Sequence, residues 1–171
     1  LVYERRRAFQ DELRPLLQEY YDQISGGQEQ IDCRYKSQLT EHSFADLMAA
    51  AREKDRILQR TTAGIHRDDL IFQIGGFPLK KYASQGQLKS YVLALKLAQY
   101  EVLRRAKQEQ PLLLLDDIFD KLDRSRVQQL IKLLLDRNFG QVFITDTSEE
   151  RLEKIISGFA LDYRKFVIQA G

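Results

Sequence analysis

The stretch Leu112–Asp123, LLLLDDIFDKLD, decides the fold expected for this chain. Its four leucines, preceded by Pro111, predict a short strand that is buried on both faces of a parallel sheet. Asp116 and Asp117 follow where the strand should reach the C-terminal edge of the sheet, which is where open α/β sheets bind ligands. This order is typical of a Walker B motif, in which one carboxylate holds Mg²⁺ and the next polarises the water that attacks a γ-phosphate. An Asp that only starts a turn or caps a helix gives the same pattern, so the neighbouring segments have to decide.

The segments around this strand predict an α/β fold. From residue 112 onward, the pattern indicates strand 112–115, helix 124–136 capped by Asp123, strand 141–145, a helix from Thr147 or Ser148 to Ile156, and strand 163–169. Such an alternation predicts a parallel sheet with right-handed connections. Upstream, the expected elements are helix 1–24, in which Pro15 should cause a kink or start a second helix, strand 30–39, helix 44–59 capped by Thr40 or Ser43, strand 70–74, a Gly75-Gly76 turn, and a helix from Ser84 to about Lys107.

Length and composition limit the class of protein. With 171 residues, 43% of them hydrophobic and 30% charged, the chain can build one domain, or a core with a small lobe. The net charge of +2 permits contact with nucleic acid without requiring it. Cys33 is the only cysteine, which predicts a reducing, cytoplasmic compartment and argues against a structural zinc site. No apolar run is long enough for a membrane span, and the start at Leu1 within a helical pattern suggests a piece of a longer protein.

Two polar segments carry further chemistry. Ser84-Gln85-Gly86-Gln87 opens a long helix, so its free N–H groups and the helix dipole make an anion site, although a plain helix cap with a turn glycine reads the same way. Thr61–Asp69, TTAGIHRDD, combines His66, Arg67, Asp68 and Asp69. This loop could serve catalysis or bind a metal, but its composition favours a hydrogen-bonded loop that packs against its neighbours.

The order of these motifs matches the second half of an ABC-type ATPase head, where a signature motif precedes Walker B and a D-loop follows it. With GIHRDDL, SQGQLK, LALKLA, PLLLLDDIFDKLD and QVFIT in this order, the sequence resembles the C-terminal half of the RecF family. That family consists of bacterial DNA replication and recombination-repair ATPases related to SMC proteins. The resemblance implies part of an ABC-type head, with mostly parallel strands and flanking helices, over residues 61–171. Residues 1–60 would then be a segment of a helical lobe with a connecting strand.

The resemblance also implies a role for each motif residue. Asp116 would be the Mg²⁺-associated acid, and Asp117 would stand in the place of the catalytic base. The signature, which would touch the γ-phosphate of ATP held by the other subunit, would be Ser84, Gln85, Gly86 and Gln87. The D-loop at the dimer interface would be Asp120, Lys121, Leu122 and Asp123. The loop of His66, Arg67, Asp68 and Asp69 would support the site.

Three departures from the family pattern affect these expectations. Ile65 replaces the proline of the usual G-P-H-R-D-D loop. The switch position after QVFIT is Asp146, followed by Thr147, where many ABC ATPases have histidine. An acid beside a γ-phosphate would repel it unless Mg²⁺ or Thr147 intervened. No G-x-x-x-x-G-K-[ST] motif occurs, so this chain alone should bind or hydrolyse ATP poorly and should expose a sheet edge.

The function that the resemblance implies is recombinational repair and replication-fork maintenance. It also implies single-stranded DNA binding and a part in the SOS response. ATP and Mg²⁺ would be the cofactors of the intact ATPase. The partners would be gapped DNA or single-strand/double-strand junctions, a RecR-like mediator, and a second copy when ATP is bound. Two alternatives remain: a non-catalytic DNA-binding or protein-interaction module on the same fold, and an SMC-type structural ATPase head.

Overall fold

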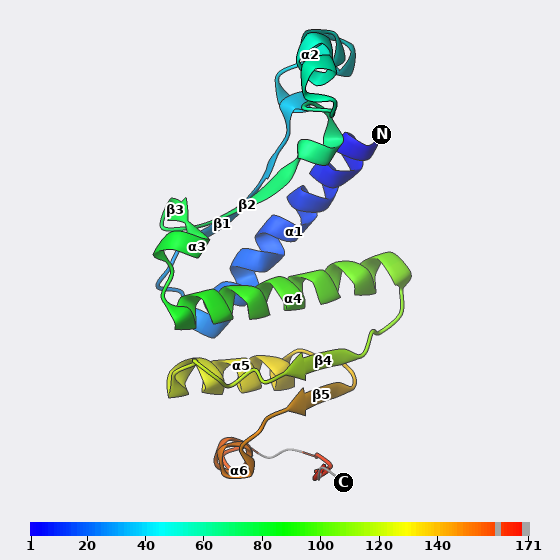
Figure 1. The fold of residues 1–171 in the computed structure, drawn as a ribbon. Coiled ribbons are helices and arrows are strands. Elements are labelled where there is room, and N and C mark those ends of the chain that lie inside the picture. The colour runs from blue at the N-terminus through cyan, green and yellow to red at the C-terminus, as the bar shows by residue number, and fades with distance from the viewer. Residues whose placement is uncertain (160–161, 169–171) are drawn as a thin grey trace.

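Two long helices, α1 and α4, cross at the centre of the molecule, and the remaining elements attach to them (Figure 1). The structure is a computed structural model that describes residues 1–159 and 162–168. In chain order its elements are α1 Val2–Ser25, β1 Ile31–Lys36, the 3₁₀ turn η1 Gln38–Thr40, α2 Phe44–Leu58, η2 Ile65–Arg67, β2 Asp69–Ile74, β3 Phe77–Pro78, α3 Leu79–Tyr82, α4 Gln85–Lys107, β4 Leu113–Asp116, α5 Arg124–Asp136, β5 Val142–Thr145 and α6 Glu149–Ile156.

The strands of the described residues form two separate sheets. β1, β2 and β3 make an antiparallel ribbon that runs alongside α1, and its register pairs Ile31 with Ile74 (Figure 1). β4 and β5 pair in parallel below α4, with Asp116 opposite Thr145. The parallel pair with its connecting helix α5 confirms the α/β arrangement predicted from Leu112 onward.

One hydrophobic core joins α1, α4, α5 and the β4–β5 sheet. Its fully buried side chains include Leu17 and Tyr21 of α1, Leu97 of α4, Leu115 of β4 and Leu130 of α5. Each fully buried leucine contributes about 1.5–3 kcal/mol relative to an exposed one. Because α1 supplies so much of this core, the structure ties the N-terminal helix to the segment after residue 84.

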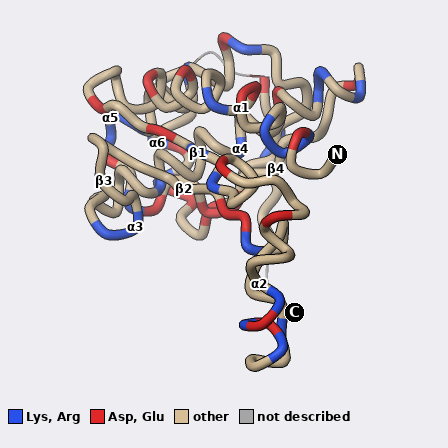
Figure 2. The backbone as a smooth tube through the Cα atoms, turned by 90° about the horizontal axis from the view of Figure 1, so that it is seen from above, with Lys and Arg blue, Asp and Glu red and all other residues tan. Residues whose placement is uncertain are grey.

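A second, small cluster holds a lobe at the far end of the ribbon. Leu47, Ala51 and Ala63 are buried there, with Leu39 and Met48 packed against them. Viewed from above, α2 projects away from the main body and carries charges of both signs (Figure 2). The packing therefore does not follow the boundary expected at residue 60, because α1 belongs to the main core and only the region from η1 to η2 forms the lobe.

Pro15 does not start a second helix, which was one of the two outcomes predicted for it. The helix continues from Val2 to Ser25 and ends at Gly26, whose φ of 80° lies in the left-handed region that favours glycine. Proline removes one backbone hydrogen bond. The burial of Leu13, Leu16 and Leu17 around it compensates for that loss.

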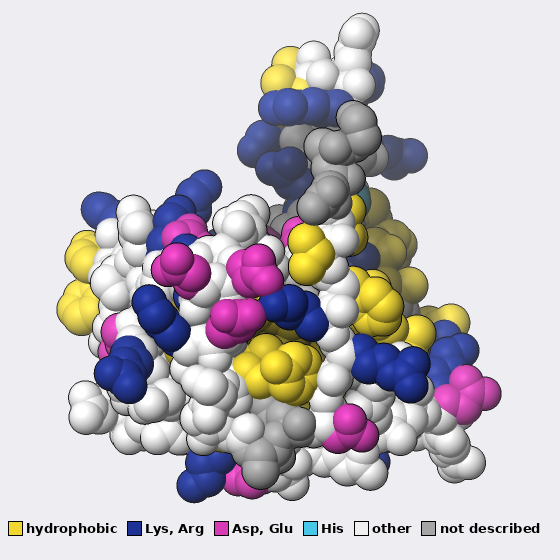
Figure 3. Space-filling model, turned by 90° about the horizontal axis from the view of Figure 1, so that it is seen from below, with side chains coloured by type: hydrophobic (Ala, Val, Ile, Leu, Met, Phe, Trp, Pro, Cys, Tyr) yellow, Lys and Arg dark blue, Asp and Glu magenta, His cyan; other side chains and the backbone are white. Residues whose placement is uncertain are grey.

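Several side chains that were expected in the core are exposed. Leu112 and Leu114 are 61% and 65% exposed, so β4 buries only the face that carries Leu113 and Leu115, and the prediction of burial on both faces is wrong for this structure. From below, hydrophobic side chains are visible among charged ones (Figure 3). Large apolar side chains on the helices are exposed as well, at Val2, Phe9, Phe44, Ile57, Leu58, Leu88, Val92 and Leu103. These helices each pack on one side only, so the apolar stripe is wider than the contact.

The C-terminal strand expected at 163–169 is absent where the structure describes it. Residues 163–168 have no strand pairing, and Gln169 lies outside the described residues. In the described part of the chain, no helix combines the length and the apolar character needed to cross a membrane.

Cys33 provides a test of the core around β1. Its side chain is fully buried, and burial together with the nearby charge of Asp32 raises the pKa of its thiol to about 11. We expect Ellman's reagent to modify Cys33 slowly at pH 8 in the folded protein and at the rate of a free thiol in 6 M guanidinium chloride, because thiolate is the reactive form. Equal rates in the two conditions would contradict this packing.

Candidate functional site

The paired carboxylates lie at the C-terminal edge of the parallel sheet, as the strand pattern predicts. Asp116 ends β4 and is exposed, and its carboxylate accepts a hydrogen bond from the hydroxyl of Thr145, its partner on β5. The amide of Asp117 donates to the carbonyl of Thr145 at 3.1 Å. The chain then turns sharply, since Asp117 has a φ of 46°, in the left-handed region that Asp tolerates better than most residues.

The turn at Asp117 is held from a second side by α4. Lys89, in the second turn of α4, donates from Nζ to the carbonyl oxygen of Asp117 at 2.8 Å. With its N–H bound to Thr145 and its C=O bound to Lys89, the backbone of Asp117 is fixed in orientation. Lys89 also places a positive charge beside the carboxylate edge.

The start of α4 has the geometry of a capping box. Ser84 Oγ accepts from the amide of Gln87 at 3.2 Å, and Gln87 Oε1 accepts from the amide of Ser84 at 2.7 Å. Ser84 and Gln85 are both exposed, so the N-terminal end of this long helix is open to an anionic ligand. The predicted cap is confirmed, and its exposure keeps the anion-site interpretation open.

The predicted D-loop, Asp120–Asp123, lies directly against the predicted signature turn, Ser84–Gln87. A Cβ atom added to Gly86 would come within 3.3 Å of the carbonyl oxygen of Lys121, so a glycine here allows the two segments to approach closely. Lys121 has a φ of 64°, and Asp123 caps α5 by accepting from the amide of Arg126 at 2.9 Å. Leu122 packs against the main core. Asp120 is 3.9 Å from the ammonium of Lys121, an exposed contact that contributes little to stability.

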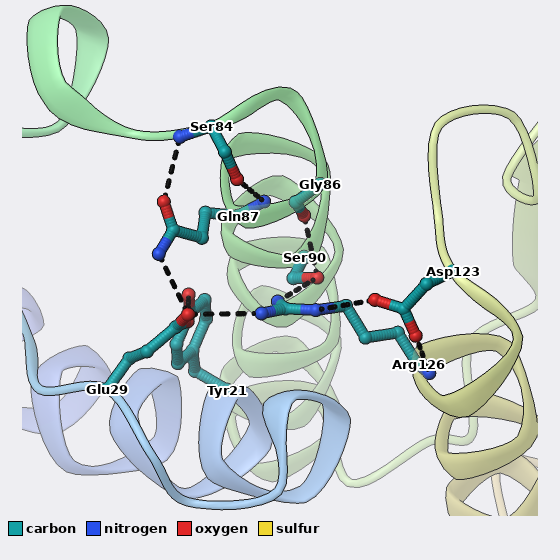
Figure 4. Close-up of polar contacts among 8 residues, drawn as sticks. All are labelled: Tyr21, Glu29, Ser84, Gly86, Gln87, Ser90, Asp123 and Arg126. Atoms are coloured by element: carbon teal, nitrogen blue, oxygen red, sulfur yellow. Dashed lines mark hydrogen bonds and ion pairs between the residues drawn. The ribbon is translucent and has the colours of Figure 1, made fainter.

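A polar cluster connects these motifs with the loop that follows α1 (Figure 4). The Glu29 carboxylate accepts hydrogen bonds from Gln87 Nε2 at 2.8 Å and from the Arg126 guanidinium at 3.1 Å. It also accepts a hydrogen bond from the hydroxyl of Tyr21. Burial raises the pKa of Glu29, but the hydrogen bonds from Tyr21 and Gln87 and the charge of Arg126 outweigh it and bring the pKa below its usual value. Burial and the bond to Glu29 raise the pKa of Tyr21. Glu29 is therefore ionised and Tyr21 neutral near pH 7.

Sequence reasoning missed Glu29, Ser90 and Arg126. Glu29 and Arg126 are separated by 97 residues, and neither belongs to a recognisable motif. The only local signal is that Arg126 falls three residues after the capping Asp123, where a cap's backbone partner is expected.

Asp146, at the predicted switch position, turns into the protein. Its side chain is fully buried, and Oδ1 accepts from the amide of Ser148 at 2.7 Å. Oδ2 has no hydrogen-bond partner and lies 3.5 Å from the Arg151 guanidinium. The carboxylate thus supports the start of α6, while the neighbouring Thr147 is exposed.

The structure does not bring the His66–Asp69 loop to the carboxylate edge. This loop lies between α2 and β2 near the N-terminus, whereas β4 lies on the other side of α4 (Figure 1). Asp68 accepts from Tyr35 and, at 3.2 Å, from Arg6, and Arg6 also donates to the carbonyl of Ile65 at 2.6 Å. Its contacts therefore fasten α1 to the ribbon, which agrees with the packing interpretation and not with a site-supporting role within this chain.

RecF proteins resemble this chain in sequence and in structure. No protein-family model matches the chain. RecF proteins, described as DNA replication and repair proteins, match all 171 residues at 46% identity in Parabacteroides distasonis and in Bacteroides thetaiotaomicron. The RecF of Flavobacterium johnsoniae is 42% identical over 165 residues, 96% of this chain.

The whole chain thus aligns with RecF, in agreement with the motif order. It matches the C-terminal half of RecF. The chain spans about half the length of the curated relatives, 47% and 46% of the first two. Two solved structures of the recombination mediator protein RecF in the RecFOR pathway, RecF-ATPrS and RecF-ATP, superpose with TM-scores of 0.69 and 0.67 at 25% identity. Each covers 87% of this chain and 42% of the solved chain. The fold is part of an ABC-type ATPase head of the RecF kind.

The donor atoms at the sheet edge are of the kind that Mg²⁺ prefers. Mg²⁺ takes one or two protein carboxylates and fills its remaining positions with water and phosphate oxygens. Asp116, exposed and beside the hydroxyl of Thr145, offers this minimal set. Among the described residues, no group of three His, Cys, Asp or Glu side chains offers a complete metal cage.

The cap of α4 can be tested by a pair of substitutions. Ser84→Ala removes the acceptor for the amide of Gln87 and should lower the free energy of unfolding by about 1 kcal/mol, whereas Ser84→Asp should retain it because Asp caps as well as Ser. Urea denaturation followed by circular dichroism measures both. Equal unfolding midpoints for Ser84→Ala and the parent would show that the cap does not stabilise α4.

Proposed function

We propose that this chain is the signature, Walker B and D-loop half of a RecF-type ATPase that acts on DNA in recombinational repair and replication. The observation that carries the proposal is the match to RecF proteins over every residue of the chain. The contact between Gly86 and the D-loop, together with the exposed carboxylate edge, supports it from the structure.

In this proposal the start of α4 acts on ATP held by a second copy. Ser84 and Gln85 are exposed, and the free N–H groups of the first turn point out of the helix end, where they would bind the γ-phosphate. Gln87 would act indirectly, because its side chain is already engaged by Ser84 and Glu29. The D-loop, Asp120–Asp123, would lie at the same interface because it touches Gly86.

Asp116 and Asp117 would divide the chemistry at the sheet edge. Bound Mg²⁺ would neutralise phosphate charge, and Asp116 is the residue that would hold it. Asp117 would accept a proton from the attacking water, and its doubly held backbone fixes the direction in which the carboxylate leaves the chain. Aspartate reaches one methylene less far than the glutamate of many ABC ATPases, so slow hydrolysis is expected.

The remaining roles extend from RecF to this chain as parts of the proposal. ATP binding between two heads would drive dimerisation, and hydrolysis would release the dimer. The dimer would bind gapped DNA or single-strand/double-strand junctions and work with a RecR-like mediator. The switch residues Asp146 and Thr147 would contribute through Thr147, since the carboxylate of Asp146 is buried. The protein would work in the cytoplasm.

Asp117→Asn tests the assignment of the base. Asn accepts a left-handed φ as readily as Asp, so the turn should persist while proton acceptance is lost. In the full-length protein, ATP hydrolysis should fall by about 10²-fold or more, with the ATP-bound dimer accumulating. Phosphate release and analytical ultracentrifugation provide the two measurements. Asp136→Asn, at the exposed end of α5, is the control, and hydrolysis by Asp117→Asn at the parent rate would refute the assignment.

Ser84→Asp tests the contact across the dimer. The variant should keep the helix cap but place a negative charge against the γ-phosphate, so ATP-dependent dimerisation should weaken by about tenfold or more. ATP binding to the monomer should stay within about twofold of the parent, since the signature touches only the other copy's nucleotide. Equal loss of both activities would contradict a contact in trans.

A further inference from the structure

Three segments of the candidate site converge on the guanidinium group of Arg126 (Figure 4). Arg126 NH1 donates to Ser90 Oγ at 2.9 Å, NH2 donates to Glu29 at 3.1 Å, and Nε lies 3.3 Å from the Asp123 carboxylate. Asp123 belongs to the D-loop, Ser90 lies on the signature helix, and Glu29 lies on the loop after α1. The Arg126 side chain thus contacts both the helix that begins with the signature turn and the D-loop.

Two of these partners pass the contact on to the signature turn itself. Ser90 Oγ donates to the carbonyl of Gly86 at 2.8 Å while it accepts from Arg126. Glu29 accepts from Gln87, whose side chain also bonds to the amide of Ser84. The signature turn is therefore connected to the guanidinium by two independent routes.

The burial of this cluster makes the connection stiff. The Arg126 side chain is only 14% exposed and that of Glu29 only 20%, while Ser90 and Tyr21 are fully buried. Charge-assisted hydrogen bonds in such surroundings are stronger than surface ion pairs, which are largely screened. Arg126 also uses the three directions of its planar fork, which the single ammonium of a lysine cannot reproduce.

We propose that Arg126 is a positioning residue that fixes the signature turn relative to the D-loop, with Glu29 as its counter-charge. The two motifs then present one rigid surface to the ATP-bearing face of a second head. This proposal rests on the proposed function for its effect on dimerisation, whereas the positioning itself is a property of the protein without nucleotide.

The same helix supplies a matched control. Arg137, at the C-terminal end of α5, pairs with Glu19 of α1 and lies over the ring of Tyr20. This pair also connects α5 to α1, but it contacts neither Ser84–Gln87 nor Asp120–Asp123. If Arg126 only attaches α5 to α1, Arg126→Ala and Arg137→Ala should have the same effect. If Arg126 positions the signature turn, only Arg126→Ala should change it.

Hydrogen exchange of the nucleotide-free, full-length protein tests the positioning directly. In Arg126→Ala, the amides of residues 84–90 and 120–123 should exchange about tenfold faster, because charge-assisted hydrogen bonds that restrain both segments are lost. In Arg137→Ala, the exchange in these two segments should match the parent. Unchanged exchange in Arg126→Ala, or an equal increase in Arg137→Ala, would overturn the proposal.

Sedimentation of the full-length protein in ATP tests the consequence. Arg126→Ala should weaken ATP-dependent dimerisation about tenfold while monomer ATP affinity stays within about twofold of the parent. If Arg126→Ala does not fold, Arg126→Lys and Glu29→Gln replace it: each should weaken ATP-dependent dimerisation relative to the parent and to Arg137→Ala. Parent-like dimerisation in Arg126→Ala, or in both replacement variants where Arg126→Ala does not fold, would overturn the effect on dimerisation. A parent protein that exchanges as expected but never dimerises with ATP would contradict the proposed function and leave the positioning supported.

Discussion

The packing of α4 against α1, in one hydrophobic core with α5 and the β4–β5 sheet, is the interaction on which the candidate site depends. Leu97 and Ala98 of α4 and Leu17 of α1 are fully or almost fully buried where these elements meet. Because α4 is a rigid rod of 23 residues, its position determines where its N-terminus emerges. That N-terminus lies beside the turn that follows β4, so a hydrophobic interface places Ser84–Gln87 next to Asp120–Asp123.

Polar contacts then refine what the core places approximately. Lys89 holds the carbonyl of Asp117, Thr145 holds its amide, and Arg126 joins Asp123 to Ser90. These bonds orient groups over distances of a few ångströms, which hydrophobic burial cannot do because it is not directional. The two kinds of interaction therefore divide the work: burial brings the segments together, and hydrogen bonds set their orientation.

The features that could be predicted from the sequence are those with local causes. Ser84 and Asp123 were expected to cap their helices, and Thr147 or Ser148 to start the last one. Ser84, Asp123 and Ser148 each accept a hydrogen bond from the backbone amide three residues later. The pairing of Glu29 with Arg126 could not be predicted, because it depends on the docking of α1 against α5 across 97 residues. The His66–Asp69 loop is instructive in the opposite sense. Its residue types resemble those of a catalytic or metal site. The loop lies at the far end of β2, away from the edge of the β4–β5 sheet, where Asp68 accepts a hydrogen bond from Arg6.

The orientation of Asp146, at the predicted switch position, is also set by the fold and could not be predicted from the neighbouring sequence. A carboxylate directed at a γ-phosphate would raise the energy of the bound nucleotide through like-charge repulsion. In this structure the Asp146 carboxylate does not point outward toward a ligand. Its side chain is buried, accepts a hydrogen bond from the amide of Ser148 and pairs with the guanidinium of Arg151. The turn leaves Thr147 exposed beside the end of β5. A neutral hydroxyl group, which can both donate and accept a hydrogen bond, is therefore the group that this position offers to a ligand.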